Sequence, residues 1–256
     1  MHPRLDSPAT GVIVTGGASG LGHASAEALA TVGRPLSLWD LDAEKVARTA
    51  QALGERYGVA ATGIAVDVRD PAALRAGAES ARAHLPSIGG LVHAAGVVDT
   101  ESIDGLTPEN WDAGMHVHLR PLALLAKELL PDLAAQAGSA IVAFASINAT
   151  LGNAANPIYT AAKGGVLSLV RSLADRLAPE GIRVNAISPG QIRTPMLQPA
   201  LDALPDGFFE KRILMERLGE PEEIGRVVRF LLSDEASYVT AAEFVVDGGN
   251  LSSQRG

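Results

Sequence analysis

A tyrosine and a lysine stand four residues apart in the segment Tyr159-Thr-Ala-Ala-Lys163. Side chains at positions i and i+4 of a helix share one face, so the ammonium group of Lys163 could stabilise a tyrosinate and lower the phenol pKa from its usual value of about 10. Ser146 stands thirteen residues before Tyr159, and its hydroxyl could hold a substrate oxygen. Together these side chains predict a site that moves the proton of a hydroxyl group, with Tyr159 as the general acid/base.

A glycine-rich segment, Gly16-Gly17-Ala18-Ser19-Gly20-Leu21-Gly22, directly follows the first run of β-branched residues. Glycines between a strand and a helix let the backbone approach a pyrophosphate closely, while the free N–H groups and positive end of the helix attract its charge. Taken alone, the pattern is equally typical of an ordinary turn.

Asp40 favours a dinucleotide site because it closes the next expected strand, eighteen residues after Gly22. A dinucleotide-binding fold needs an acceptor for the adenosine ribose at this place. A carboxylate accepts from both ribose hydroxyls and repels a 2′-phosphate, and no Arg or Lys stands at positions 18, 19 or 41, so the sequence predicts NAD rather than NADP. Asp67, ending the third expected strand, could meet the adenine edge or cap a turn, and Asp42 is interpreted as a helix N-cap.

These residues must be positioned by regular elements, and short apolar runs alternate with longer Ala/Leu-rich stretches along the chain. Strands are expected at 11–15, 35–40, 61–67, 90–94, 140–145, 182–187 and 243–247, and helices at 21–33, 43–57, 71–84, 108–131, 158–178 and 221–232. Strands that are apolar throughout are buried on both faces, which predicts an α/β fold: a doubly wound, seven-stranded parallel sheet flanked by helices, the Rossmann fold.

The whole chain, 1–256, is expected to form one domain. Its cofactor half would span about 10–145 and its catalytic and substrate half about 146–256. The proline-containing segment at about 190–215 has no clear period, which is typical of a lid or binding loop.

Composition excludes several classes of function. With 47% hydrophobic and 20% charged residues the chain can build a sizeable core, and its net charge of −8 would repel the phosphates of a nucleic acid. Cysteine is absent, which excludes disulfides, thiolate catalysis and cysteine-based zinc sites, and no metal is expected. The N-terminus lacks an apolar signal core, and about 18 consecutive apolar residues occur nowhere, so no membrane partner is expected and a cytoplasmic location is the default.

Several motifs in this order resemble those of the short-chain dehydrogenase/reductase family, in its single-domain NAD(P)-dependent branch, over nearly the whole chain. They include Ala94-Ala95-Gly96, Asn185-Ala-Ile-Ser-Pro189-Gly190, Thr194-Pro195-Met196 and the ending from Glu220 to Gly249. The resemblance implies an NAD-dependent oxidoreductase that transfers a hydride between nicotinamide and a secondary alcohol or ketone. Ser146 would orient the oxygen, Tyr159 would move the proton, and Lys163 would tune Tyr159 and hold the nicotinamide ribose.

The resemblance also implies a set of cofactor contacts, which combine with those derived above. The predicted cofactor-binding residues are Gly16, Ser19, Gly20, Leu21, Gly22, Asp40, Leu41, Asp67, Val68, Ala94, Ala95, Gly96, Tyr159, Lys163, Pro189, Gly190, Ile192 and Thr194.

Two histidines depart from the family pattern. His93 stands where the family usually has Asn, and His118, in Val117-His118-Leu119, replaces an Asn that kinks the central helix and leaves a carbonyl to hold a relay water behind the lysine. One hypothesis adds His118 to the catalytic residues as a substitute in that relay, with a second ionisation in the pH–rate profile. The alternative is that both histidines are hydrogen-bonded packing residues.

The predicted substrate pocket is formed by 147–156, Val97, Val98 and the lid, and its mostly apolar side chains suit a hydrophobic secondary alcohol or ketone.

A 3-oxoacyl-carrier-protein reductase is an alternative that Asp40 disfavours. A non-catalytic NAD-binding sensor or scaffold is another, against which the intact Ser-Tyr-Lys set argues. The family packs helices equivalent to 108–131 and 158–178 between subunits, which implies a homotetramer or homodimer.

Overall fold

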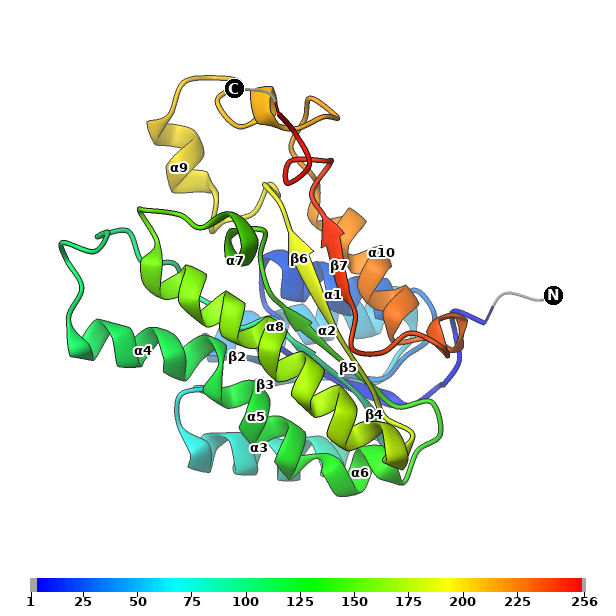
Figure 1. The fold of residues 1–256 in the computed structure, drawn as a ribbon. Helices are drawn as coiled ribbons and strands as arrows, with labels where there is room; N and C mark the ends of the chain where they lie inside the picture. The colour runs from blue at the N-terminus through cyan, green and yellow to red at the C-terminus, as the bar shows by residue number, and fades with distance from the viewer. Residues whose placement is uncertain (1–3, 255–256) are drawn as a thin grey trace.

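The computed structural model describes residues 4–254, and a parallel sheet forms the centre of this part of the chain (Figure 1). Its strand order is β3-β2-β1-β4-β5-β6-β7, and each neighbouring pair is parallel. The strands are β1 (Gly11–Thr15), β2 (Leu36–Asp40), β3 (Ala61–Ala65), β4 (Ile88–His93), β5 (Ala140–Phe144), β6 (Arg183–Pro189) and β7 (Glu243–Val246). The doubly wound, seven-stranded sheet predicted from the sequence is confirmed. The direction of winding reverses between β1 and β4, where such folds bind ligands.

Helices cover both faces of the sheet (Figure 1). The helices are α1 (Gly20–Ala30), α2 (Ala43–Tyr57), α3 (Pro71–His84), α4 (Pro108–His118), α5 (Arg120–Glu128), α6 (Leu130–Ala134), α7 (Asn148–Leu151), α8 (Pro157–Leu177), α9 (Gln198–Ala203) and α10 (Pro221–Leu231), with short 3₁₀ turns η1 (Ala178–Glu180), η2 (Glu210–Arg212) and η3 (Asp234–Ala236).

Alternate residues of each central strand point to opposite faces, which divides the core into two layers. Ile13 of β1 and Ile141 of β5 pack with α3, α5 and α8, whereas Val12 and Val142 pack with α1, α2 and α10. Both layers are built largely from fully buried aliphatic side chains. The sheet is therefore a rigid platform from which loops at the carboxyl ends of its strands extend.

The single helix expected at 108–131 is wrong, because three shorter helices occupy this stretch. Pro121 lies in the first turn of α5 and Pro131 in the first turn of α6. Proline has no N–H to donate to the preceding turn and its ring collides with the carbonyl there, so a helix restarts at each of these prolines. The first break falls directly after His118, where α4 ends.

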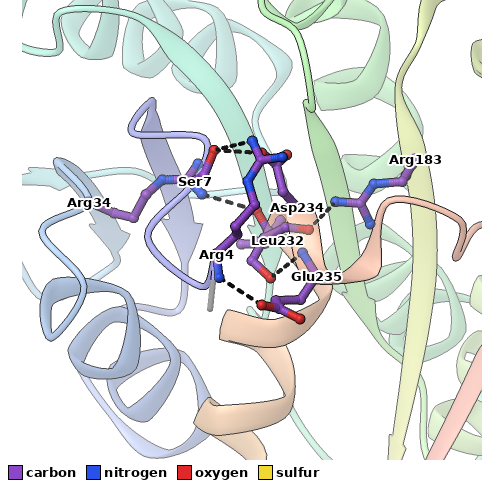
Figure 2. A network of polar contacts seen from close by, with 8 residues as sticks. Arg4, Ser7, Arg34, Arg183, Leu232, Asp234 and Glu235 are labelled. Atoms are coloured by element: carbon purple, nitrogen blue, oxygen red, sulfur yellow. Dashed lines mark hydrogen bonds and ion pairs between the residues drawn. The ribbon is translucent and has the colours of Figure 1, made fainter. Parts of the chain in front are cut away.

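Two buried arginines, Arg34 and Arg183, bind the end of α10 and the residues that follow it (Figure 2). Arg34 donates to the Thr10 carbonyl at 2.5 Å, to the Thr10 hydroxyl at 3.0 Å and to the Leu232 carbonyl at 3.1 Å. Arg183 donates to the carbonyls of Leu231 at 2.7 Å, Ser233 at 3.1 Å and Val239 at 3.4 Å. Carbonyls at the end of a helix lack intrahelical partners, so these guanidinium groups satisfy them. Burial lowers the pKa of Arg34 to about 10, which leaves it protonated at neutral pH.

No helix within residues 4–254 has both the length and the apolar character needed to cross a bilayer.

Candidate active site

A cavity of about 970 Å³ opens at the carboxyl ends of the central strands. Its walls run from the glycine-rich loop after β1, past the ends of β2, β4 and β5, to α8 and the segment after β6. Every residue that the sequence indicated as a catalytic or cofactor contact lines this cavity, although these residues come from eight separate segments of the chain. The fold thus brings the two predicted groups, the phosphate end and the chemical end, into one continuous space.

The glycine-rich loop has a backbone conformation that depends on its glycines. Gly16 and Gly20 have φ angles of 67° and 51°, in the left-handed region that favours glycine. A Cβ atom at Gly22 would lie 2.1 Å from the Gly16 carbonyl oxygen, so no other residue fits there without moving the loop. The first turn of α1 receives no side-chain cap from Ser19 and contains no acidic residue, which suits an incoming phosphate.

Asp40 lies at the end of β2, beside this loop, and its carboxylate accepts the N–H of Ala18 at 3.1 Å and that of Leu41 at 2.9 Å. Asp67 stands one strand further along, and Arg69 binds its carboxylate through both oxygens at 2.7 to 3.1 Å. The hydrogen bonds from Arg69 lower the pKa of Asp67. Arg69 also lines the cavity, although it is not among the residues predicted from the sequence.

Ser146, Tyr159 and Lys163 meet at the other end of the cavity. Ser146 follows β5, and the other two side chains lie one turn apart near the start of α8. The Lys163 ammonium donates to the Phe144 carbonyl at 2.7 Å and stands 5.4 Å from the centre of the Tyr159 ring. The predicted helical spacing therefore places both groups on one face, with the lysine over the ring.

Burial is the largest influence on the ionisation of this pair. It lowers the pKa of Lys163 to about 7. It raises the pKa of Tyr159, while a hydrogen bond with the Ser146 side chain acts in the opposite direction. The four-residue spacing predicts that Lys163 lowers the phenol pKa, but in this protein desolvation is the largest influence on both groups because each is enclosed by protein.

The two unusual histidines form hydrogen bonds to backbone carbonyls. His93 Nε2 lies 3.1 Å from the His118 carbonyl and its Nδ1 lies 2.9 Å from the Thr15 hydroxyl. Since a carbonyl only accepts, the proton of His93 is on Nε2. By the same reasoning His118 donates from Nε2 to the Val97 carbonyl at 2.8 Å, and its ring meets the Tyr159 ring edge-on with centroids 5.3 Å apart.

Both histidines are neutral at physiological pH because burial lowers the pKa of His93 to about 4 and that of His118 to about 2. This disagrees with the hypothesis that His118 adds a second ionisation to the pH–rate profile. The His118 carbonyl, which the family resemblance linked to a relay water, accepts a hydrogen bond from His93 Nε2. The hydrogen bonds of both rings agree with the alternative that His93 and His118 are packing residues. The His118 ring also contacts the ring of Tyr159.

Replacing His118 by Asn is expected to leave the number and position of the inflections in the kcat profile unchanged between pH 5 and 10. The value of kcat should fall by about 3- to 10-fold, which corresponds to about 1 kcal/mol of lost interaction. The substitution removes the edge-on contact with Tyr159, and the shorter Asn side chain reaches the Val97 carbonyl less well. Steady-state rates across this pH range measure both quantities. His84→Asn on the exposed side of α3 is the matched control. An inflection that disappears in the His118 variant alone would show that the ring does titrate.

Known proteins are similar in sequence to this one over most of the chain. A family model described as Enoyl-(Acyl carrier protein) reductase matches residues 16–250. The probable galactose dehydrogenase GalD of Rhizobium meliloti is 35% identical over 241 residues, which cover 93% of this chain and 94% of that protein. D-threitol dehydrogenase of Mycolicibacterium smegmatis is 35% identical over 246 residues, covering 96% and 94%.

Among solved structures, L-sorbose reductase from Gluconobacter frateurii, complexed with NADPH and L-sorbose, has a TM-score of 0.89 and 31% identity over 94% of this chain and 96% of that one. The fold and the cavity define a nucleotide-binding oxidoreductase of the Rossmann type. Within that class, the chain belongs to the short-chain dehydrogenase/reductase family, whose members named above act on alcohols and sugars.

Proposed function

We propose that this protein is an NAD-dependent dehydrogenase that interconverts a secondary alcohol and the corresponding ketone. The observation that supports this most strongly is the meeting of Ser146, Tyr159 and Lys163 in the cavity that also contains the glycine-rich loop and Asp40. A proton donor or acceptor at the substrate oxygen is what the chain itself must provide for this reaction.

The bound nicotinamide would supply the hydride transfer. The loop from Gly16 to Gly22 would hold the pyrophosphate, and Asp40 would accept from the adenosine ribose. Ser146 would orient the substrate oxygen beside the Tyr159 hydroxyl. In the direction of reduction Tyr159 donates its proton to this oxygen, and in the direction of oxidation the phenolate takes the proton away. Lys163, held by the Phe144 carbonyl, would in its protonated form stabilise the phenolate and is placed to hold the nicotinamide ribose.

The preference for NAD rests on the charge at the end of β2. Asp40 presents a carboxylate to the region where a 2′-phosphate would lie, and repulsion between the two would disfavour NADP. Arg69 lines the cavity close to Asp67, and its guanidinium group forms an ion pair with the Asp67 carboxylate. The sorbose reductase was solved with NADPH, so the choice of NAD for this chain depends on Asp40 and not on that relative.

The substrate end of the cavity is mainly apolar, which favours a hydrophobic substrate. Its apolar lining residues include Val97, Val98, Ile147, Met196, Leu197, Leu204, Phe208 and Phe209. Asn153 and Asn156 also line it, but their side chains bond the Ala155 N–H and the Asp99 carbonyl and so support the local loops. Polar recognition of a substrate would fall mainly to Ser146, Tyr159 and the amides of Asn148 and Gln191.

The test is an absorbance screen at 340 nm with NAD and NADP in parallel against cyclic and acyclic secondary alcohols, sugars, hydroxysteroids and hydroxyacyl thioesters. Turnover with NAD supports the proposal, and a preference for hydroxyacyl thioesters with NADP would support a 3-oxoacyl-carrier-protein reductase instead. Tight NADH binding with no turnover across the panel would favour the non-catalytic NAD-binding protein.

Self-association is part of the proposal, as a homotetramer or homodimer formed through α4, α5 and α8. Trp111 on α4 is 37% exposed, and a partner subunit could cover this large apolar side chain. Light scattering that gives the mass of one chain at all concentrations would contradict this.

A further inference from the structure

Helix α8, which carries Tyr159, begins without a cap of its own. Asn156 occupies the N-cap position, but its side chain accepts no hydrogen bond from the first turn. Pro157 follows and has no N–H, so the first N–H groups of the helix are those of Ile158 and Tyr159. N–H groups in the first turn of a helix have no intrahelical acceptor, and these two need one from elsewhere.

Asp99 supplies this acceptor from the loop between β4 and α4. Its carboxylate accepts the Tyr159 N–H at 2.9 Å through one oxygen and the Ile158 N–H at 3.2 Å through the other, across a separation of 60 and 59 residues. A carboxylate at a helix N-terminus is stabilised by the helix dipole, and hydrogen bonds to a charged acceptor are stronger than neutral ones. One side chain thus fixes the backbone of Tyr159 itself.

The loop that carries Asp99 is held in place by further contacts at the start of α8 and at the end of α4. The Asn156 amide donates to the Asp99 carbonyl, and the Ser102 N–H donates to the Ala155 carbonyl at 3.4 Å. At the start of the loop, Val97 accepts from His118, whose ring packs against the Tyr159 ring. The loop therefore restrains Tyr159 through its backbone and, by way of His118, through its ring.

We propose that Asp99 is a positioning residue that holds Tyr159 in register with Ser146 and Lys163. This inference rests on the proposed function for the role of the phenol, but the contacts themselves do not depend on it. Catalytic groups that are displaced by about 1 Å lose up to about 100-fold in rate, so the support of the first turn of α8 matters for turnover. The same displacement would weaken the hydrogen bond with Ser146 that lowers the pKa of Tyr159.

The decisive measurement is the pKa of Tyr159 by NMR of protein labelled with ¹³C at the tyrosine Cζ. The chain has only three tyrosines, and the spectrum of Tyr159→Phe assigns the signal. Asp99→Ala is expected to raise this pKa and to lower kcat about 10-fold, with the dissociation constant of NADH within about 2-fold of the wild-type value. Asp99→Asn keeps an oxygen for the Tyr159 N–H and is expected to retain the wild-type pKa and at least half of the wild-type kcat.

Asp70→Ala is the matched control, because Asp70 caps α3 from its own N-cap position by accepting the Ala72 N–H at 2.8 Å. It should lower the melting temperature as Asp99→Ala does, but leave kcat and the Tyr159 pKa unchanged. An equal loss of kcat in the Asp70 variant would reduce the effect to general destabilisation and overturn the proposal. Equal pKa shifts in the alanine and asparagine variants at position 99 would attribute the effect to charge and overturn it as well.

The NMR measurement keeps the two proposals separable. A wild-type protein that turns over none of the alcohols would refute the dehydrogenase activity, while the pKa of Tyr159 in the Asp99 variants would still decide the positioning role. Asp99→Ser replaces the alanine variant if the latter does not fold, and a wild-type Tyr159 pKa in every folded variant at this position would overturn the inference.

Discussion

The Tyr159→Phe variant is expected to lose at least about 1000-fold in kcat while binding NADH with nearly wild-type affinity. Phenylalanine keeps the ring, its edge-on contact with His118 and its place on α8, and removes only the hydroxyl that exchanges a proton with the substrate. General acid/base catalysis contributes about 10²- to 10⁴-fold, so a loss of this size, about 4 kcal/mol, corresponds to the removal of the whole proton step. Rates at 340 nm and titration by NADH fluorescence measure the two effects separately.

The pH dependence adds a second readout to this variant. Burial raises the pKa of Tyr159. Oxidation of an alcohol needs the deprotonated phenol, so the wild-type rate of oxidation should rise with pH through a high apparent pKa, while the rate of reduction should fall over the same range. The residual rate of the phenylalanine variant should lack this inflection in both directions.

Tyr57→Phe provides the control, because it removes a tyrosine hydroxyl at the end of α2 that donates to Glu27 at 2.7 Å and does not line the cavity. It should cost about 1 kcal/mol in stability and leave kcat unchanged. If Tyr159→Phe kept a tenth or more of the wild-type kcat, another group would have to be the proton donor.

Local signals in the sequence explain where the predicted elements were accurate. The expected helices at 43–57 and 71–84 have the observed bounds of α2 and α3, because Asp42 and Asp70 cap their first turns and Gly58 ends α2 in a left-handed conformation. Pro121 and Pro131 are equally local signals, and in the structure they start new helices within a stretch whose composition is helical throughout. Short elements such as α7 and α9 carry too few residues for a periodic pattern to be detected.

The site was predictable where its chemistry follows from spacing and was not where it depends on tertiary contacts. Tyr159 and Lys163 share a helix face because of their four-residue separation. Their ionisation, in contrast, is governed by burial, which no local pattern reports. Asp99 gave no local signal either, because its partners lie some sixty residues away and its role depends on how the loop after β4 meets α8. Arg69 stands two residues from Asp67, and this short separation predicts an ion pair between them.

The substitution Asp40→Ala is expected to change the ratio of kcat/KM for NAD to that for NADP by about 300-fold. The variant loses charge-assisted hydrogen bonds to the ribose hydroxyls and at the same time removes the charge that repels a 2′-phosphate. These two changes together amount to about 3 kcal/mol, which is in the range expected for losing hydrogen bonds to a charged group. About 30-fold of the change should come from weaker use of NAD and about 10-fold from improved use of NADP.

Asp40→Asn separates the two contributions, because it keeps an acceptor for the ribose and for the Ala18 N–H but carries no charge. It should recover part of the NAD activity and all of the gain with NADP. Asp42→Ala controls for proximity: this residue caps α2 by accepting the Lys45 N–H at 2.9 Å and does not line the cavity, so its loss should cost about 1 kcal/mol in stability and leave the cofactor ratio unchanged. A ratio that Asp40→Ala leaves at the wild-type value would mean that the adenosine ribose does not lie at the end of β2, and the preference for NAD would then need a different physical cause.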